Sequence, residues 1–321
     1  MCVLFLRLFF VKTTRSLSLC SKSAQSLLRL IASRGHGARA KNKEPMDSNT
    51  LYYSLDLVSG SGHALNGEQR AALQTSLVLL KKNYKFNRVM FWGKILGIKE
   101  DYFIAQGKGH DELKDKQFLY SFNCMEWHLL PPADDAMLGE VSRAAKGRFM
   151  GDPSHEYTDY PLKREGEEAA EAVELIKVTE ERRLAVTVHL IDEEVSVVPR
   201  GAFNRTHLGL MNANRCFEGL SHAEAGKLEN FLHFAKPKKL KKKKLIQEQA
   251  DLDPSVDFLD PLSDDVPKGQ WSLQLENASS VCVLRSLLWM GLTFYHVPMT
   301  PQHGYVYFGY GCKNLDLPFM L

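Results

Sequence analysis

The feature that most constrains this fold is a series of apolar, aromatic-rich segments separated by very short polar breaks. Residues 88–98 and 102–107 lie on either side of a charged three-residue break, 99–101, and this pattern predicts a β-hairpin. Four further segments of this kind follow towards the C-terminus, at 271–276, 281–289, 292–297 and 305–310. Because parallel strands need crossover connections of about a dozen residues or more, breaks this short favour antiparallel pairing.

Amphipathic helices are predicted before and between these two groups of strands. Asn66 and Gln69 have the spacing of a capping box, and an apolar stripe of Leu73, Leu77 and Leu80 follows, which predicts a helix ending near residue 82. Further helices are predicted at 48–58, 135–145 and 221–234, with partial helix at 163–182. Further strands are predicted at 117–130 and within 184–203, where one strand lies on each side of the acidic residues 192–194. The order predicts an α+β fold with a mainly antiparallel β-sheet core and a few amphipathic helices.

The first 45 residues differ in composition from the rest of the chain. Residues 1–45 hold nine Lys/Arg and one acidic residue, whereas residues 46–321 hold 32 Lys/Arg and 37 Asp/Glu. Ordinary globular composition begins at Met46, so we expect 1–45 to be a flexible, disordered, basic N-terminal extension and 46–321 to be the folded domain. An Arg- and Ser-rich segment poor in acids is also typical of a mitochondrial transit peptide, which leaves a mitochondrial protein as an alternative.

A second charged segment lies inside the domain. Residues 236–244 hold seven lysines, and a run of acidic residues follows, so the stretch at about 236–267 is predicted to be a surface linker. The lysines could also contact an acidic protein partner, such as the acidic tails of tubulin, or a nucleic acid. No aromatic residue is interleaved among them to stack on bases, which argues against nucleic acid as the partner.

The chemistry-bearing motifs of enzymes are missing from the sequence. The glycine-spaced segment 304–311 lacks the Gly-Lys-Ser/Thr of a phosphate-binding loop, and the acidic segment 251–262 lacks the glycine and the final glutamate of a calcium loop. His128 and His296 occur singly and are predicted to be ordinary core or rim residues, and the acidic clusters 111–112 and 192–194 to be solvated turns. The scattered cysteines indicate reduced thiols in a cytosolic protein, and no apolar run reaches the 18 or so residues of a membrane span. The sequence therefore predicts no enzyme, no cofactor and no metal site.

The chain is rich in aromatic residues, with four Trp, eleven Tyr and seventeen Phe. Most should lie in the core, and those exposed on strand faces would suit a protein–protein interface, where Trp and Tyr concentrate binding energy. The predicted interface residues are Phe91, Trp92, Tyr102, Phe103, Trp289, Tyr295, Tyr305 and Tyr307.

Several long blocks of sequence are similar to a known family. The segments 83–107, 127–132, 146–157, 251–260 and 285–296, with the closing segment from Gly304, resemble the radial spoke head protein family in order and over 46–321. The hairpin at 91–107 and the terminal strands also resemble the larger 4/6-type members of that family. Two features depart from the family pattern, namely the additional residues 1–45 and the high lysine content of 238–244.

The resemblance implies a function that composition alone does not give. It implies a structural subunit of the radial spoke head in the axoneme of motile cilia and flagella, which is part of the cytoskeleton in the cytoplasm. It also implies pairing with a 4/6-type spoke head protein, contact with other spoke head subunits, and an indirect relay of signals between the central pair projections and the outer doublets. Neither an active site nor a cofactor comes with the family, and neither nucleic acid nor membrane is implied as a partner.

Overall fold

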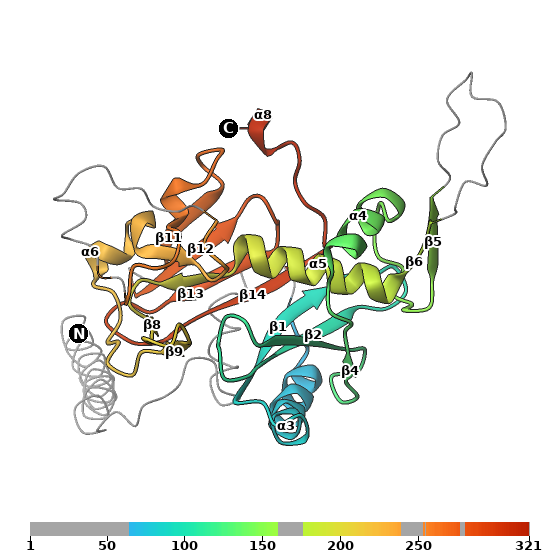
Figure 1. Cartoon of the computed structure of the whole chain (residues 1–321), viewed down its shortest axis with the longest axis horizontal. Coiled ribbons are helices and arrows are strands. Elements are labelled where there is room, and N and C mark those ends of the chain that lie inside the picture. The colour runs from blue at the N-terminus through green and yellow to red at the C-terminus, as the bar shows by residue number, and fades with distance from the viewer. Residues whose placement is uncertain (1–63, 160–175, 239–252, 254, 277–279, 321) are drawn as a thin grey trace, which may run out of the picture. The chain divides into compact units, whose positions relative to one another are not determined.

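The computed structural model describes residues 64–159, 176–238, 253, 255–276 and 280–320 (Figure 1). The chain divides into two units, Met1–Lys43 and Glu44–Leu321, and all the described residues belong to the second. The predictions for residues 1–45, for a helix at 48–58, for most of 163–182 and for the lysines from 239 to 244 therefore fall outside the described residues.

The centre of the described fold is a sheet of eight strands in the order β11-β12-β13-β14-β1-β2-β3-β4. The strands are β1 (Arg88–Ile95), β2 (Tyr102–Lys108), β3 (Lys116–Ser121), β4 (His128–Leu129), β11 (Trp271–Glu276), β12 (Val281–Ser286), β13 (Leu292–His296) and β14 (His303–Gly309). All neighbours pair antiparallel except β1 and β14, which pair parallel through Gly93–Ile95 and Tyr307–Gly309. This one parallel pairing joins an N-terminal group of strands to a C-terminal group.

The predicted strands are confirmed in both groups, and so is the α+β fold class. β1 and β2 form the predicted hairpin, with a register shift between Phe91 and Gly93. The predicted strand at 117–130 is wrong in its length, because a turn divides it into β3 and the two-residue β4. The side chain of Asn123 holds this turn by accepting hydrogen bonds from the backbone N–H groups of Met125 and Glu126, both at 2.9 Å.

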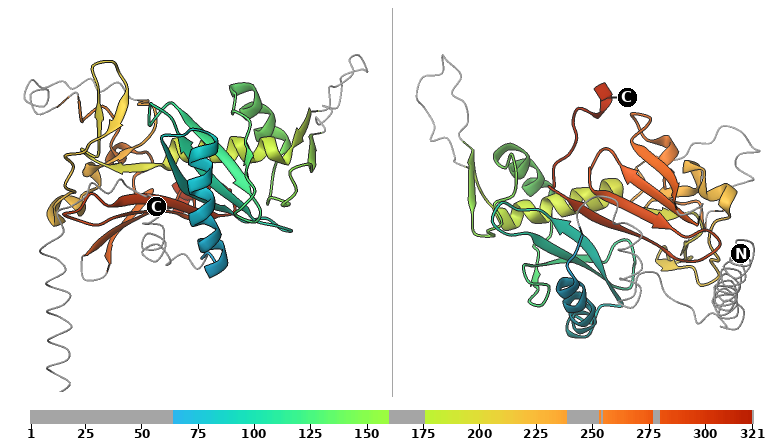
Figure 2. Two further views of the ribbon diagram at one scale, coloured as in Figure 1. Left: turned by 90° about the horizontal axis from the view of Figure 1, so that it is seen from below. Right: turned by 180° about the vertical axis from the view of Figure 1, so that it is seen from behind.

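Helix α3 (Gly67–Asn83) forms as predicted, and it packs on one face of the sheet. The backbone N–H of Asn66 donates to the side chain of Gln69 at 3.0 Å, which forms the capping box. Leu73, Leu77 and Leu80 are buried with strand residues such as Phe91 in one hydrophobic cluster. Figure 2 shows α3 and a second long helix, α5 (Glu180–Val195), on opposite sides of strands β1 to β3.

Helix α5 replaces the first of the two strands predicted at 184–203, so that prediction is wrong for residues 184–195. The second predicted strand forms in part, as β7 (Val197–Pro199). Leu184, Val188, Ile191 and Val195 are spaced as one face of a helix, and all four are buried against the sheet. The β-branched residues of this segment favour strand in isolation, but burial of the apolar face outweighs that weak local preference. Figure 1 shows α5 running across the sheet.

Shorter elements surround this core. Helix α4 (Asp135–Ala144) forms as predicted. Three two-stranded ribbons pair β5 (Glu156–Asp159) with β6 (Ile176–Thr179), β7 (Val197–Pro199) with β10 (Phe231–His233), and β8 (Phe203–Arg205) with β9 (Met211–Ala213). The prediction of partial helix at 163–182 is wrong for 176–179, which form strand β6. The remaining elements are α6 (His222–Ala225), the 3₁₀ turns η2 (Leu228–Asn230) and η3 (Leu262–Asp264), and α8 (Leu317–Met320).

The helix predicted at 221–234 is mostly wrong, although its capping box is present. Ser221 and Glu224 make the reciprocal bonds of the box, but helix α6 ends at Ala225 and Gly226 follows as its C-terminal cap. The chain then enters β10, where Phe231 pairs with Pro199 of β7. Pairing with a distant strand therefore overrides the local helical pattern.

The acidic part of the predicted surface linker is packed where it is described. Leu259 and Leu262 are buried, at 1% and 2% exposure. Asp257 accepts two hydrogen bonds from the guanidinium of Arg200, at 2.6 and 2.7 Å. Residues 255–264 therefore differ from a solvated linker, and Asp257 of the candidate calcium loop is bound to a cation of its own chain.

Candidate functional site

The eight aromatic residues predicted to form an interface all lie in the interior. None is more than 4% exposed. Trp92, Tyr102, Trp289, Tyr305 and Tyr307 pack in the cluster beneath α5. The other three, Phe91, Phe103 and Tyr295, pack in the cluster beneath α3. In this conformation the eight side chains present no surface to a partner, because the chain uses both faces of its central strands for its own core.

The centre of the fold carries a buried polar network around Asp192 of α5. Its carboxylate accepts hydrogen bonds from the indole N–H of Trp92 at 3.2 Å, the amide of Gln106 at 3.1 Å, the ammonium of Lys116 at 2.6 Å and the hydroxyl of Tyr305 at 2.9 Å. These four donors come from β1, β2, β3 and β14, which are consecutive in the sheet. One side chain therefore bonds the helix to four neighbouring strands, including both strands of the parallel pairing.

The predicted solvated turns at 192–194 and 111–112 are corrected by this burial. Asp192 is 4% exposed and Asp111 is 2% exposed. Burial raises the pKa of Asp192, but the attraction of Lys116 and its hydrogen bond outweigh burial and lower the pKa below the ordinary value. Asp192 lies one turn from both Val188 and Val195, so a helical interpretation of the segment would have placed it on the buried face.

A second buried carboxylate, that of Glu180, binds the first turn of α5 to neighbouring segments. It accepts hydrogen bonds from two tyrosine hydroxyls and from three consecutive backbone N–H groups: Tyr102 at 2.7 Å, Tyr157 at 2.5 Å, Met150 at 2.8 Å, Gly151 at 2.7 Å and Asp152 at 3.1 Å. Burial raises its pKa, and the hydrogen bonds from Tyr157 and from the backbone outweigh burial and lower it. A carboxylate in the first turn of a helix also interacts favourably with the helix dipole.

The other end of α5 is bound to the loop between β12 and β13 and to the segment after β14. Glu194 accepts a hydrogen bond from the indole N–H of Trp289 at 2.8 Å and forms an ion pair with Lys313 at 2.7 Å. Three acidic residues, Glu180, Asp192 and Glu194, therefore connect one helix to the sheet, to the loop after α4 and to the segment that follows β14. This arrangement restrains the motion of these parts relative to one another.

The histidines singled out in the sequence are placed without a catalytic partner. His296 is buried between the carbonyl of Gln302, at 3.0 Å from Nδ1, and the backbone N–H of Leu220, at 3.1 Å from Nε2. Burial lowers its pKa to about 4, so the neutral ring satisfies both contacts. His128 is exposed on β4, beside the ring of Tyr120. His296 is therefore a core residue, as predicted, whereas His128 lies at the surface.

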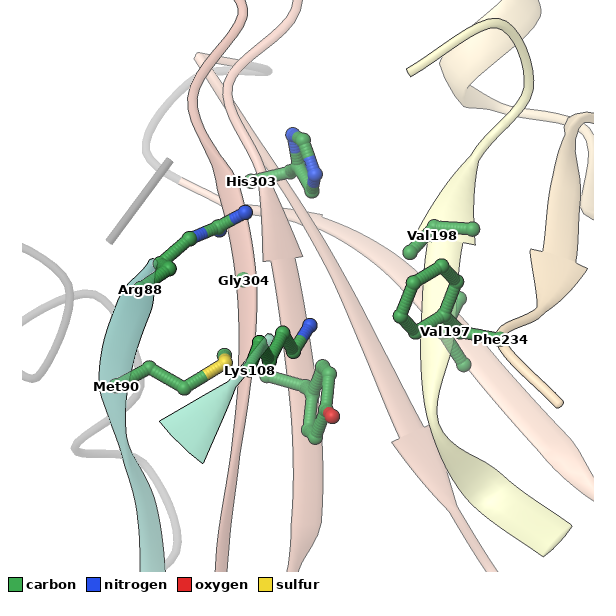
Figure 3. A pocket seen from close by; sticks show the side chains of 9 residues that line it. Arg88, Met90, Lys108, Val197, Val198, Phe234, His303 and Gly304 are labelled. Atoms are coloured by element: carbon green, nitrogen blue, oxygen red, sulfur yellow. The ribbon is translucent and has the colours of Figure 1, made fainter. Parts of the chain in front are cut away.

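A small cavity opens between β1, β2, β14 and β7 (Figure 3). It is lined by Arg88, Met90, Lys108, Val197, Val198, Phe234, His303, Gly304 and Tyr305. Its volume of about 20 Å³ is close to the roughly 10–15 Å³ that one water needs, and far below that of a cofactor site. Burial lowers the pKa of Lys108 to about 7 and that of His303 to about 3.

Two further observations concern ligands and membranes. Within the described ranges, no group of three or more His, Cys, Asp or Glu side chains is arranged to hold a metal ion. No helix in those ranges is long and apolar enough to cross a lipid bilayer.

Comparison with known proteins identifies the family. The chain is 59% identical to the radial spoke head protein 9 homolog of Danio rerio over 278 residues, which are 86% of this chain and 100% of that protein. The chain belongs to the radial spoke head protein family. Its identity to the homologs of Bos taurus and Homo sapiens is 53% and 52%, again over 86% of this chain and all of each relative. The profile of the family described as radial spokehead-like protein matches residues 15–193.

Family membership confirms the resemblance found in the sequence. It places the chain in the radial spoke of the ciliary axoneme as a structural protein, and this is not an enzyme family. It also implies other spoke head subunits as partners.

The stability of the fold is expected to fall as the pH drops below about 4.5. The folded state holds the pKa of Glu180 below its ordinary 4.5 and that of Asp192 below its ordinary 3.8. A carboxyl group whose pKa is lower in the folded state than in the unfolded state stabilises the fold. This stabilisation is complete above the unfolded-state pKa and is lost as the pH falls through the folded-state pKa. Urea unfolding near pH 7 and near pH 3 measures the loss. A Glu180→Gln variant should be less stable than the unaltered chain at neutral pH, but its free energy of unfolding should fall less on acidification. An equal fall in both proteins would contradict this origin of the pH dependence.

Proposed function

We propose that this chain is a non-enzymatic structural subunit of the radial spoke head that pairs with a 4/6-type spoke head protein. In that position it helps to relay mechanical signals between the central pair and the outer doublets, and so contributes to axoneme assembly and to ciliary and flagellar motility. The observation that carries the proposal is the bonding of α5, through Asp192, to four consecutive strands of the sheet.

A subunit that transmits force must deform little when it is loaded. Hydrogen bonds to an ionised carboxylate are about twice as strong as those between neutral groups, and networks in the interior specify one arrangement of their members. The Asp192 and Glu180 networks tie together segments up to 113 residues apart in the sequence. Such cross-linking supports a rigid body that transmits displacement rather than a mobile enzyme lid.

The surface also supports a role within an assembly. Large apolar side chains are exposed on the described surface, among them Leu315 at 76%, Met320 at 70% and Phe319 at 89%. Exposed apolar side chains that gather into a patch mark protein–protein contacts more often than isolated ones do. A partner that covers such side chains binds the folded chain and not the unfolded one, and it therefore stabilises the fold.

Co-expression with a 4/6-type spoke head protein is expected to raise both the soluble yield and the melting temperature of this chain. At a partner concentration about 100 times the dissociation constant, the gain in the free energy of unfolding is about 2.7 kcal/mol. Differential scanning calorimetry of the purified pair against the chain alone measures it, with a non-ciliary protein of similar size as the control. A fully stable monomer with no affinity for the 4/6-type protein would refute the proposed pairing.

A further inference from the structure

The segment that follows β14 combines a fixed path with an exposed apolar end. We infer that this C-terminal segment (310–320) is a preformed docking element that inserts into an apolar groove on the subunit with which the chain pairs. The inference rests on the proposed function for the existence of that partner, and it adds which surface of this chain makes the contact.

The end of the segment exposes three large apolar side chains. Leu315, Phe319 and Met320 are 76%, 89% and 70% exposed. The loop between β12 and β13 is hydrogen-bonded to this segment through the carbonyls of Leu287 and Leu288. This loop also exposes Met290 at 60% and Leu287 at 37%. Five large apolar side chains are therefore available to a partner, and a buried Phe alone contributes roughly 150–250 Å² of contact area.

The beginning of the segment is fixed against the core. Gly311 has a φ of 67°, and its backbone N–H donates to the hydroxyl of Tyr307 at 3.0 Å. A Cβ atom at this position would lie 2.7 Å from the ring of Phe149, so the chain turns away from the sheet at a site that only glycine fits without rearrangement. Lys313 follows with its ion pair to Glu194 of α5.

The middle of the segment is fixed to the β12–β13 loop. The backbone N–H of Asn314 donates to the carbonyl of Leu288 at 2.8 Å, and its side-chain amide donates to the carbonyl of Leu287 at 3.2 Å. The same amide lies 3.7 Å from the sulfur of Met320, which brings the end of the segment beside the loop. Leu317 is buried at 2% exposure and anchors α8. Figures 1 and 2 show α8 clear of the sheet at the end of this segment.

A fixed path and an exposed apolar end together favour a partner over solvent. Moving exposed Leu, Met and Phe side chains from water into a groove lined by aliphatic and aromatic side chains lowers the free energy. Because the segment is already ordered, binding costs little additional conformational entropy. Membership in a family of assembly subunits supplies the partner, so the occupant we assign is a neighbouring subunit rather than a membrane or a second copy of this chain.

The test compares the full chain with a Phe319→Ser/Met320→Ser variant. Isothermal titration calorimetry with the purified 4/6-type protein is expected to show binding weakened by about 30-fold or more. Truncating a central aromatic anchor typically causes a loss of affinity of that size. A Leu208→Ser variant, changed at an exposed residue of the β8–β9 turn, is the matched control and should bind within about twofold of the unaltered chain. The isolated variants should melt at the temperature of the unaltered chain.

Each other outcome overturns the inference in a recognisable way. Equal affinities of the double variant and the unaltered chain would show that the pairing uses another surface, while the proposed function would stand. A lower melting temperature of the isolated double variant with unchanged affinity would show that this chain itself covers the apolar end. If the unaltered chain does not bind the 4/6-type protein at all, the proposed function fails and the docking element fails with it.

Discussion

An Asp192→Ala variant is expected to unfold with a free energy about 3–5 kcal/mol lower than that of the unaltered chain. The substitution leaves the ammonium of Lys116 in the interior without its carboxylate, which is 2.6 Å away in the structure. It also removes the acceptor of the buried Trp92 and Gln106 donors and leaves the hydroxyl of buried Tyr305 with its long 3.4 Å hydrogen bond to Gln106. A buried donor without an acceptor costs roughly 1–3 kcal/mol, and these losses are not simply additive because the groups form one network.

The matched control for this prediction is Glu193→Ala, at the next residue of the same helix. The Glu193 side chain is 35% exposed, and its ion pair with Lys238 is 3.4 Å long and lies at the surface, so its loss should cost less than about 1 kcal/mol. Equilibrium urea unfolding of both variants provides the comparison. Similar losses for the two variants would mean that the network around Asp192 does not hold α5 to the sheet.

The strands could be predicted from the sequence because their signal is local. Two apolar runs on either side of Lys99-Glu100-Asp101 have only one short way to pair, and the same holds for the runs that end with 305–310. The parallel pairing of β1 with β14 could not be predicted in this way. Gly93 and Tyr307 are far apart in the chain, and nothing in either segment specifies the other.

Helix α5 was mispredicted and the burial of the eight aromatic residues was not predicted, both because burial on the two faces of a sheet is a long-range property. The segment 184–195 is rich in β-branched residues, and only the sheet against which it packs makes the helix favourable. Strand β2 is buried at all of its seven positions, and strand β14 likewise. Continuous apolar runs such as YVYF are typical of strands covered on both sides, and this signal could have placed Tyr305 and Tyr307 in the core rather than at an interface.

The other large effect is expected at Gly93, in the pairing that joins the two halves of the sheet. A Cβ atom at Gly93 would lie 2.3 Å from the backbone oxygen of Tyr307 and 2.9 Å from its backbone nitrogen. Neither atom can move away without separating β1 from β14. A Gly93→Ala variant is therefore expected to lose about 3 kcal/mol or more of its free energy of unfolding, at the upper end of what overpacking costs.

Gly139→Ala in helix α4 is the control that separates this clash from the general effect of replacing glycine. A Cβ atom there would have nothing within 4 Å, so alanine should be neutral or should stabilise the chain by about 0.5–1 kcal/mol through its higher helix propensity. Urea unfolding of both variants gives the two values. If Gly93→Ala is as well tolerated as Gly139→Ala, then β14 can shift relative to β1 at little cost. The two halves of the sheet would then be free to move against each other, and this subunit could not transmit force as a rigid body.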